Sequence, residues 1–401
     1  MRVLAIGGSG GMGRFAVRTA ERYSGVESIL VADLNNLEAE KFAATLGKKV
    51  IGIGLDVLDK NSLKKTLKYV DIVLNTSGPF FKLGVPILEA VIDSGCHYLD
   101  ICDDWEPTIE MLKLNDRAKE KGVSAIIGLG ASPGISNLLG LMAIHELDEV
   151  KKVYTGWNME GAKPEEESSQ KGTNAAMEHA IEQMTGRVKV FLNSEFKLIK
   201  PMRKIEVDYP GSGKAFAKVF GHPEAVTFPS YFPGLEESLN LAHGNEDTDL
   251  IISLLLSLVE WKILPKKTAA KIFGWLEAKV PMPDYDNMHK PSLPAIYGLA
   301  IGTRNGKKAS VGTSIGSVHS QDSVVDTSNI GMGSITGIPL ACGLKMLLDG
   351  QITERGVLAP ESGAINPQYF FSEVLSALQG KESSTKPSIE GFVHISRSWE
   401  V

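Results

Sequence analysis

The sequence has few cysteines, little net charge and no long hydrophobic run. Its 401 residues include three cysteines, Cys96, Cys102 and Cys342, which are too few for a framework of disulfides, and no C-x-x-C pair occurs. The most apolar run, Leu250 to Val259, is roughly half as long as a membrane-spanning helix, and we expect it to form a buried or subunit-facing helix. These absences predict a cytoplasmic protein of a reducing compartment, with no signal peptide and no membrane partner.

The charge of the chain also argues against several classes of partner. Against 42 lysines and arginines stand 48 aspartates and glutamates, for a net charge of −6, so the surface has no general attraction for nucleic acid or an anionic membrane. His145-Glu146 lacks the second histidine of a zinc-binding H-E-x-x-H helix, and we expect no metal. The length exceeds one ordinary core, which predicts about two domains.

What the chain does have is a glycine-rich loop directly after its first apolar run. Arg2 to Ile6 is long enough for one buried strand, and a helical pattern begins after Gly13. Between them, Gly8-x-Gly10-x-x-Gly13 has the spacing of a dinucleotide-binding turn, in which missing side chains let the backbone approach a pyrophosphate. The N–H groups and the positive dipole end of the following helix then face the phosphates.

The same letters support a second interpretation. Gly7-Gly-Ser9-Gly-Gly11 also fits G-x-S-x-G, the nucleophile elbow of an α/β-hydrolase, and a plain turn is a third interpretation. Residues further along favour the nucleotide. Ser28 to Asp33 is a second apolar run that ends in an acid twenty residues after Gly13, where a carboxylate binds the ribose hydroxyls of an adenosine. The hydrolase interpretation explains neither Gly13 nor Asp33.

Residues 1 to about 130 alternate short Val/Ile/Leu runs with amphipathic helical segments. The expected strands are residues 2–6, 28–33, 49–56, 71–76, 97–102 and 124–129, and a single helix is expected over residues 107–121. This alternation is typical of a parallel sheet covered on both faces. We therefore predict an α/β fold with a Rossmann-type doubly wound parallel sheet, and a dinucleotide-binding domain over residues 1–135.

Beyond residue 150 the pattern changes. Val188–Leu192 and Lys204–Asp208 alternate in period two, as one-sided antiparallel strands do. Asn305-Gly306 between two apolar runs is a strong hairpin signal, and helical spacing returns near the C-terminus. We predict an inserted α+β domain for substrate binding and dimerisation over residues 136–335, and a C-terminal segment, about 336–401, that packs on the first domain.

Ligands of open α/β sheets bind beyond the carboxyl ends of the strands, and this rule selects the predicted cofactor-binding residues. The glycine loop follows the first strand and Asp33 ends the second. Asp56 and Val57, which we expect to lie beside the adenine, follow the third. The segment after the fourth strand lines the nicotinamide ribose. The predicted residues are Gly8, Ser9, Gly10, Gly11, Met12, Gly13, Asp33, Leu34, Asp56, Val57, Asn75, Thr76, Ser77, Gly78, Pro79, Cys102, Ala131, Ser132 and Pro133.

Asp33 also bears on the choice of cofactor. A carboxylate at this place repels a 2′-phosphate, and Leu34-Asn35-Asn36 supplies no compensating cation. We therefore predict NAD rather than NADP. Arg14 is a cation close by in sequence, and we expect it to face solvent or the pyrophosphate.

Candidates for proton transfer lie at and after the fifth strand. Asp103 follows the strand beside Trp105, whose bulk can raise a carboxyl pKa by desolvation. Tyr98 is the second candidate, with core packing as its alternative role. For the substrate we predict contacts from Phe80 and Trp105, and from a helix start at Gly172-Thr173, whose free N–H groups suit a carboxylate. An ordinary helix cap is the alternative there.

Several segments resemble the saccharopine dehydrogenase-like family, which includes lysine 6-dehydrogenases and carboxynorspermidine dehydrogenases. The matching segments are Gly7–Arg14, Asn75–Phe80, Gly95–Asp100, Gly128–Asn137 and Gly350–Val357 with Pro360-Glu361. The resemblance implies a nucleotide domain with an inserted α+β domain, a homodimer, and oxidation of a carbon–nitrogen bond in amino-acid metabolism. It does not imply one substrate, because the family also has lipid-acting branches.

Three functions stay open from the sequence. The first is an NAD(P)-dependent dehydrogenase that transfers hydride at a C–N bond of a lysine- or saccharopine-like amino acid, with Asp103 as the base that keeps the amine neutral. The second is an enoyl or keto reductase on a hydrophobic acyl substrate, with Phe80-Phe81 and Phe228–Pro233 lining an apolar cleft. The third is a nucleotide-binding regulator without chemistry. We favour the first, because the glycine loop, Asp33 and the family-like segments agree with it.

Overall fold

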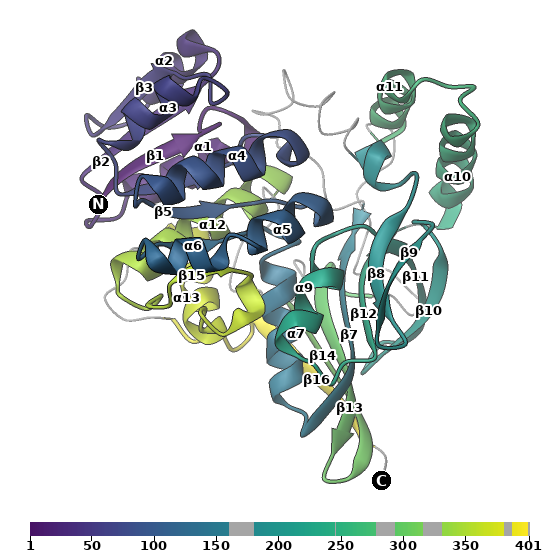
Figure 1. Cartoon of the computed structure of the whole chain (residues 1–401). Coiled ribbons are helices and arrows are strands. Elements are labelled where there is room, and N and C mark those ends of the chain that lie inside the picture. Colours follow the sequence, from purple (N-terminus) through teal and green to yellow (C-terminus); the bar gives the residue numbers. More distant parts are fainter. Residues whose placement is uncertain (160–179, 245, 278–292, 316–330, 381–386, 400–401) are drawn as a thin grey trace. The chain divides into compact units, whose positions relative to one another are not determined.

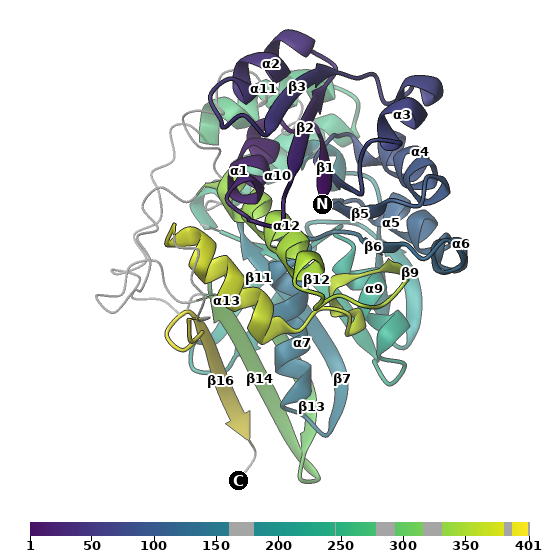
Figure 2. The same cartoon turned by 90° about the vertical axis from the view of Figure 1, so that its left-hand side faces the viewer.

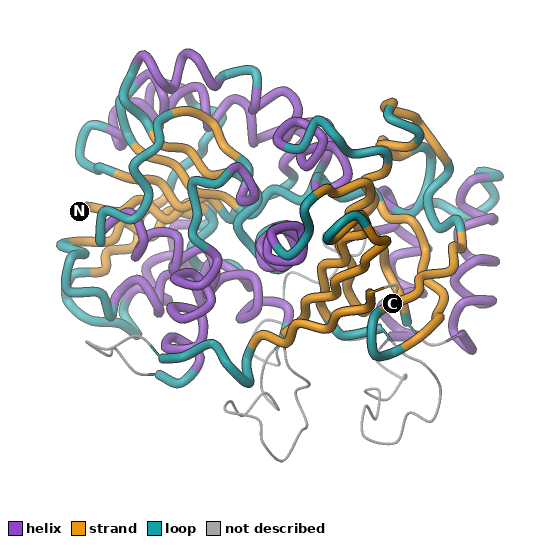
Figure 3. Tube along the Cα trace, turned by 90° about the horizontal axis from the view of Figure 1, so that it is seen from below, coloured by secondary structure: helices purple, strands orange, loops and turns teal. Residues whose placement is uncertain are grey.

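The computed structural model describes residues 1–159, 180–244, 246–277, 293–315, 331–380 and 387–399 (Figure 1). The chain divides into two compact units. Unit 1 comprises Met1–Ile135 and Met332–Ile389, and unit 2 comprises Ser136–Gly331 and Glu390–Val401. Figure 3 shows the helices, strands and loops along the chain trace.

Unit 1 is built on a sheet of seven parallel strands in the order β15-β6-β5-β4-β1-β2-β3. The strands are β1 (Arg2–Ile6), β2 (Ser28–Asp33), β3 (Val50–Gly54), β4 (Ile72–Asn75), β5 (His97–Asp100), β6 (Ser124–Ile126) and β15 (Gly356–Leu358). Their apolar side chains are buried, as expected for a sheet with helices on both faces. The order 3-2-1-4-5-6 is that of a Rossmann fold, so the predicted fold class is confirmed.

The helices of unit 1 connect these strands. They are α1 (Gly11–Glu21), α2 (Asn36–Ala43), α3 (Lys60–Leu67), α4 (Phe80–Asp93), α5 (Trp105–Leu112), α6 (Asn115–Glu120), α12 (Met332–Leu348), the 3₁₀ turn η4 (Pro360–Ser362) and α13 (Pro367–Leu378). The single helix predicted over residues 107–121 is wrong. Lys113 N donates to Glu110 O and Leu114 N donates to Met111 O, and these tighter i→i−3 bonds end α5 before α6 begins.

The C-terminal part of unit 1 returns to the glycine-loop helix. Figure 2 shows α12 beside α1, and the two helices touch at a glycine. A Cβ on Gly337 would lie 2.2 Å from the carbonyl oxygen of Met12 and 3.0 Å from the nitrogen of Ala16. This close approach is possible because Gly337 has no side chain. Strand β15 also joins the sheet, beside β6.

Unit 2 is built on a nine-stranded sheet whose main path is β10-β11-β12-β7-β13-β14-β16, with β8 paired to β12 and β9. Its strands are β7 (Glu149–Asn158), β8 (Val188–Leu192), β9 (Glu195–Ile199), β10 (Lys204–Tyr209), β11 (Gly213–Phe220), β12 (Glu237–His243), β13 (Ile296–Arg304), β14 (Lys307–Ile315) and β16 (Val393–Trp399). Strands β7 and β12 are parallel, and the other pairs are antiparallel.

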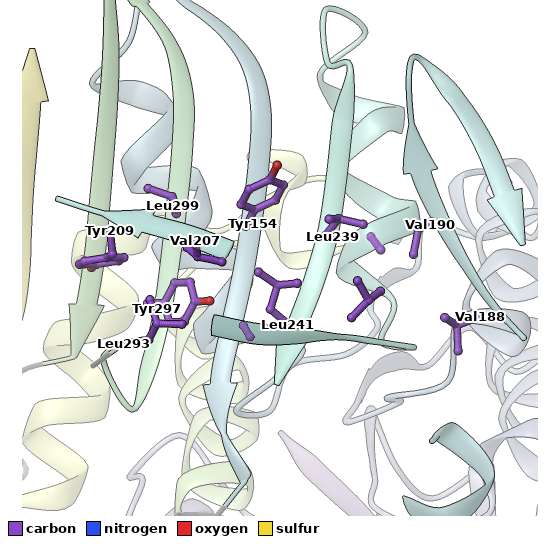
Figure 4. Close-up of a cluster of buried hydrophobic side chains, with 13 residues drawn as sticks. Tyr154, Val188, Val190, Val207, Tyr209, Leu239, Leu241, Leu293, Tyr297 and Leu299 are labelled. Atoms are coloured by element: carbon purple, nitrogen blue, oxygen red, sulfur yellow. The ribbon is translucent and has the colours of Figure 1, made fainter. Parts of the chain in front are cut away.

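The described helices of unit 2 are α7 (Ile135–His145), α9 (Glu224–Tyr231), α10 (Glu246–Glu260) and α11 (Lys266–Glu277). One face of the sheet carries a cluster of buried side chains from β7, β12 and β13, in which Tyr154, Leu241 and Tyr297 lie close together (Figure 4). The rings of Tyr209 and Tyr297 meet edge to face, with centroids 5.4 Å apart, a favoured aromatic geometry. This core is formed by residues of unit 2 alone.

Two expectations for unit 2 have different outcomes. The Asn305-Gly306 hairpin is confirmed, since both residues have positive φ, 52° and 73°, as a type I′ turn requires. The assignment of the whole segment 336–401 to the first domain is wrong at its end. Strand β16 pairs with β14 in unit 2, where it supplies partners for N–H and C=O groups that an edge strand would leave unpaired.

The apolar run around α10 is a helix, as expected. Leu255, Leu256 and Val259 are buried, whereas Ile251 and Leu254 are 48% and 61% exposed. Within the described ranges, no helix combines the length and hydrophobicity that crossing a membrane requires.

Candidate functional site

The glycine loop after β1 is shaped by contacts that leave no room for side chains. Gly7 has a φ of +71°, in the left-handed region that favours glycine. A Cβ on Gly13 would lie 2.2 Å from the carbonyl oxygen of Gly7, and a Cβ on Gly8 would lie 2.9 Å from the carbonyl oxygen of Ala5. The glycine spacing seen in the sequence is therefore a steric requirement of this turn.

The loop leads directly into the first turn of α1. Gly10 is the N-cap residue and makes no side-chain cap hydrogen bond. The loop is fixed from within, because Gly10 N donates to Gly7 O (3.0 Å) and Gly7 N donates to Ala32 O (2.8 Å). The N–H groups of a first helical turn have no acceptors within the helix. An anionic phosphate is the group that such a helix start binds well.

Ser9 joins the loop to the end of β2. Its Oγ donates to Asp33 Oδ2 at 2.5 Å, and Asn35 N donates to Asp33 Oδ1 at 3.2 Å. A carboxylate oxygen accepts more than one hydrogen bond, so Asp33 keeps acceptor capacity for ribose hydroxyls. Leu34 is 77% exposed. The Ser9–Asp33 pair does not fit a nucleophile elbow, whose serine is activated by a histidine.

Arg14 lies on the Asp33 side of the loop. Its Nε donates to the carbonyl oxygen of Ser9 at 2.6 Å, and its guanidinium carbon is 5.0 Å from the ring centroid of Phe42 on α2. Arg18 is a second cation over the same ring, at 5.7 Å. Arg14 is half-buried, and the aromatic face of Phe42 attracts its cation. Its predicted contact with solvent or the pyrophosphate stays a prediction.

Asp56 and Val57 follow β3, one strand further from the loop. Strands β2 and β3 pair in parallel up to Asp33 and Gly54, so the two residues lie at the same sheet edge as Asp33. Asp56 is exposed, and its Oδ1 accepts from Leu58 N at 2.9 Å. Their predicted contact with the adenine stays a prediction.

Thr76 ties the end of β4 to the glycine loop. Its backbone N donates to Ile6 O (2.9 Å), and its Oγ1 donates to Gly7 O (3.0 Å). Strands β1 and β4 are neighbours in the sheet, and the strand order reverses between them. Ligands of doubly wound sheets bind at this switch point, so Thr76 holds the two halves of the site together.

Asn75 and Ser77 form a polar chain at the same place. Asn75 is fully buried. Its Oδ1 accepts from Ser77 N (3.0 Å) and Ser77 Oγ (2.6 Å), and its Nδ2 donates to Tyr98 OH (2.9 Å). Tyr98 on β5 is also fully buried, and burial raises the pKa of its hydroxyl well above the ordinary value. Tyr98 therefore supports Asn75 from below the surface, and its predicted catalytic role stays a prediction.

The segment after Ser77 runs into α4. Gly78 and Pro79 are exposed, consistent with their predicted place at the edge of the site. Phe80 is only 5% exposed, and a Cβ on Gly84 would lie 3.4 Å from its ring. The exposed aromatic residue is Phe81, at 59%. The predicted contact of Phe80 with a substrate stays a prediction, and the structure places its ring in the core.

Asp100, at the end of β5, is a buried acid that the sequence analysis did not select. Its Oδ1 accepts from Cys102 N (3.0 Å) and Gly128 N (2.7 Å), and its Oδ2 is buried. Burial raises the pKa of Asp100 to about 6, against the lowering effect of the two N–H donors and of the Tyr98 hydroxyl. An acid as the last residue of an otherwise apolar parallel strand is the sequence signal that could have identified it.

The residues after β5 differ in exposure. Cys102 is fully buried, and burial raises the pKa of its thiol. Asp103 and Trp105 are half-buried, so both are reachable from solvent at the sheet edge. Asp104 is the N-cap of α5, and its carbonyl oxygen accepts from Thr108 Oγ1 at 2.7 Å. Asp103 is therefore the acid in this segment that is best placed to meet a ligand.

The loop after β6 is the last of the segments that follow the carboxyl ends of the parallel strands. Gly130 N donates to Pro133 O (2.8 Å), and a Cβ on Gly134, whose φ is +121°, would lie 2.2 Å from Gly130 O. This tight turn leaves Ala131 and Ser132 half-buried and Pro133 buried. The predicted site residues of unit 1 thus meet along one sheet edge. Gly172 and Thr173 lie outside the described residues.

These features fit a dinucleotide. The loop has no space for Cβ atoms, a helix start follows it, and a carboxylate stands at the end of β2. Across the described part of the chain, no group of three or more histidine, cysteine, aspartate or glutamate side chains is arranged to hold a metal ion. Fold and site together define unit 1 as a dinucleotide-binding Rossmann unit.

Comparison with known proteins shows which family unit 1 is similar to. Residues 3–126 match the family model described as the saccharopine dehydrogenase NADP binding domain. The resemblance predicted from the sequence motifs is therefore confirmed, and the match supports a nicotinamide nucleotide as the cofactor. It does not distinguish NAD from NADP.

Relatives extend the likeness beyond unit 1. The chain is 21% identical to carboxyaminopropylagmatine dehydrogenase of Synechocystis, over 93% of this chain and 95% of that protein. It is 30% identical to a probable mitochondrial saccharopine dehydrogenase-like oxidoreductase of Arabidopsis thaliana, but the match covers 35% of this chain and about a third, 34%, of that protein. Saccharopine dehydrogenase (L-Glu forming) of Saccharomyces cerevisiae shares the fold over 100% of both chains, with a TM-score of 0.61 and 14% identity.

Proposed function

We propose that the chain is a nicotinamide-dependent oxidoreductase that acts at a C–N bond of an amine-bearing amino acid. The observation that carries this proposal is the continuous edge from the glycine loop through the Ser9–Asp33 bond to the Asn75–Ser77 pair. Such an edge offers separate places for a diphosphate, an adenosine ribose and a nicotinamide ribose.

Each part of the edge has a proposed role. The first turn of α1 holds the diphosphate, and Asp33 accepts hydrogen bonds from the adenosine ribose. Ser77, fixed by Asn75, contacts the nicotinamide half. A bound nicotinamide supplies the hydride acceptor or donor. Holding both reactants in one orientation contributes a large part of the rate of such reactions.

We propose NAD as the preferred form of the cofactor. The carboxylate of Asp33 repels a 2′-phosphate, and its Oδ2 is already oriented by Ser9. Arg14 opposes this preference as a cation on the same side of the loop, but its Nε is engaged by the carbonyl oxygen of Ser9 and its guanidinium packs over Phe42. The balance favours the unphosphorylated ribose.

The amine-bearing substrate is proposed from two kinds of support. Two of the relatives are named for carboxyaminopropylagmatine and for saccharopine, compounds that carry amines. In unit 1, half-buried Asp103 lies at the sheet edge, where a carboxylate can take a proton from a substrate ammonium group. A neutral amine is what oxidation at a C–N bond needs.

A reductase of hydrophobic acyl substrates has less support. Phe80 is 5% exposed, and Phe228 of α9 is fully buried, so neither ring is free to line an apolar cleft. The homodimer and the cytoplasmic location stay predictions.

A substrate panel tests the proposal. The full-length protein is mixed with NAD and amino acids or N-carboxyalkyl amines, and in separate reactions with NADH and acyl thioesters. We expect NADH to form with at least one amine and not to be consumed by the thioesters. Turnover of a thioester alone contradicts the proposal in favour of the reductase, and NADH binding without any turnover favours the regulator.

A further inference from the structure

A chain of hydrogen-bonded side chains runs from Ser77, at the nucleotide edge of unit 1, down to Asp100 at the end of β5. Its inner members Asn75, Tyr98 and Asp100 are all fully buried. They lie on adjacent strands, since Asn75 of β4 stands opposite Asp100 of β5 in the parallel register. Ser77 is half-buried, so it is the member of the Ser77–Asp100 chain that a ligand can reach.

The amide of Asn75 has one orientation that satisfies this chain. The backbone N–H of Ser77 can only donate, so the Asn75 atom that lies 3.0 Å from it is the acceptor oxygen Oδ1. The NH2 group of Asn75 therefore faces Tyr98, where Nδ2 lies 2.9 Å from the hydroxyl oxygen. Because an NH2 group only donates, the hydroxyl oxygen of Tyr98 accepts this bond.

The hydroxyl proton of Tyr98 is then directed to the carboxyl group of Asp100. Burial raises the pKa of Tyr98, and the hydrogen bond with Asp100 raises that pKa further. Burial also raises the pKa of Asp100, and the same hydrogen bond acts against that rise. These are the effects of a hydroxyl that donates to a carboxylate. The backbone N–H groups of Cys102 and Gly128 donate to Oδ1 of Asp100 and hold this acceptor in place.

The direction of these hydrogen bonds determines what Ser77 offers to a ligand. Ser77 Oγ lies 2.6 Å from Asn75 Oδ1. Because that oxygen only accepts, the hydroxyl proton of Ser77 is used inside the chain, and the lone pairs of Oγ remain as acceptors. A ligand group that hydrogen bonds to Ser77 Oγ therefore has to be a donor.

The nicotinamide half of a dinucleotide carries two kinds of donor, the carboxamide NH2 group and the ribose hydroxyls. We propose that Ser77 Oγ accepts a hydrogen bond from one of these donors, and that Tyr98, held by Asp100, is a positioning residue for this contact. The inference rests on the cofactor site of the proposed function. It gives Tyr98 a role other than the proton transfer predicted from the sequence.

Calorimetric titrations of the full-length protein, without an amine substrate, test which donor Ser77 meets. The ligands are NAD, its 3-acetylpyridine analogue, which lacks the carboxamide nitrogen, and ADP-ribose, which lacks the pyridine ring. Ser77→Ala should weaken NAD binding about fivefold, the usual loss for one hydrogen bond. Only NAD loses affinity if the donor is the carboxamide, and all three ligands lose it if the donor is the ribose. Ser94→Ala, at the end of α4, is the control and should change none of them.

A double-mutant cycle tests the role of Tyr98. Tyr98→Phe keeps the ring and removes the acceptor of Asn75 Nδ2. It should weaken NAD binding in the wild type and have no further effect in Ser77→Ala, because both changes remove the same contact. A merely structural loss would be equal in the two backgrounds. Tyr23→Phe, which removes another buried hydroxyl of unit 1, should leave NAD binding unchanged.

Asp100→Asn serves as a second variant if Tyr98→Phe fails to fold. It replaces an acceptor of the Tyr98 proton by an amide and should give the same non-additive loss with Ser77→Ala. Unchanged NAD affinity in Ser77→Ala, or additive losses in the cycle, overturns the inference and leaves the proposed cofactor site standing. Absence of NAD binding by the wild type overturns both. The predicted losses without turnover of any amine uphold the inference and contradict the proposed activity.

Discussion

The loop after β1 is shaped by backbone contacts, whereas the polar groups after β4 and β5 are held by buried side chains. In the loop, the decisive distances join missing Cβ atoms to carbonyl oxygens, as for Gly13 and Gly7. After β4 and β5, the decisive contacts are hydrogen bonds between side chains, as for Asn75 and Tyr98, or from backbone N–H groups to the carboxylate of Asp100. Both parts lie on one sheet edge.

The difference explains how each part responds to change. A backbone-shaped turn tolerates no added atom, because neighbouring backbone cannot move aside cheaply. A buried side-chain network tolerates atoms of the same shape, but its energy depends on charge and on whether every polar atom is satisfied. Substitutions that add atoms should therefore abolish the function of the loop, and substitutions that change charge should have large, pH-dependent effects around β5.

The largest expected effect is that of Gly13→Val. Its side chain would meet the carbonyl oxygen of Gly7 within 2.2 Å, so the loop has to open and dinucleotide binding should be abolished. Fluorescence titration with NADH measures this, with circular dichroism as the check of folding. Gly84→Ala is the matched control in unit 1, because its Cβ finds ordinary contacts at 3.4 Å. If Gly13→Val binds NADH as tightly as the wild type, the claim that backbone contacts leave no room for a side chain at this position is wrong.

The next effect concerns the charge of Asp100. Burial raises the pKa of Asp100 from 3.8 to about 6, so the folded state binds a proton more tightly than the unfolded state. The wild type should therefore lose about 3 kcal/mol of stability from this group as the pH rises from about 4 to 7. Asp100→Asn does not titrate, so its stability relative to wild type should improve by that amount over the same range.

Urea unfolding of both proteins at pH 4, 5.5 and 7 measures this difference, because the titration of all other groups cancels in the comparison. Asp116→Asn, which changes an exposed acid on α6, is the control and should show no such trend. A constant difference between Asp100→Asn and wild type across the pH range contradicts the buried-acid account.

A smaller effect is expected for Asp103→Asn. With a substrate found in the panel, turnover should fall about 100-fold because a general base contributes about that much. The affinity for NADH should stay the same, since Asp103 is proposed to act on the substrate. Asp116→Asn again provides the control. Unchanged turnover removes Asp103 from the mechanism, and a parallel loss of NADH affinity reassigns it to the cofactor.

The smallest effect is expected for Asp33→Ala. Loss of a charged hydrogen-bond acceptor should weaken NADH binding about tenfold, and loss of the repulsion should strengthen NADPH binding. The ratio of the two dissociation constants is the measurement. Arg14→Ala should change the ratio in the opposite sense if its guanidinium reaches the same ribose. A wild-type ratio that already favours NADPH overturns the preference for NAD and leaves the site itself standing.

The fold and the nucleotide loop were predictable from the sequence because local patterns determine them. Parallel strands appear as apolar runs, and the glycine spacing follows directly from the clash distances at Gly8 and Gly13. The break between α5 and α6 was not predictable, since both segments continue one helical pattern. Strand β16 was missed because the edge that it covers, β14, lies about 80 residues earlier in the chain.

The side-chain contacts of the site were less predictable, because they join residues that are far apart in the sequence. Burial of Asp100 and Phe80 depends on neighbours from other elements, and so does the place of Arg14 over Phe42. Contacts between distant segments decide these features.

The most direct test of the central claim is calorimetric titration of the wild-type protein with NADH, with Gly13→Val measured in parallel. The account predicts saturable one-to-one binding to the wild type and no binding to a folded Gly13→Val. Absence of binding by the wild type to both NADH and NADPH would contradict it.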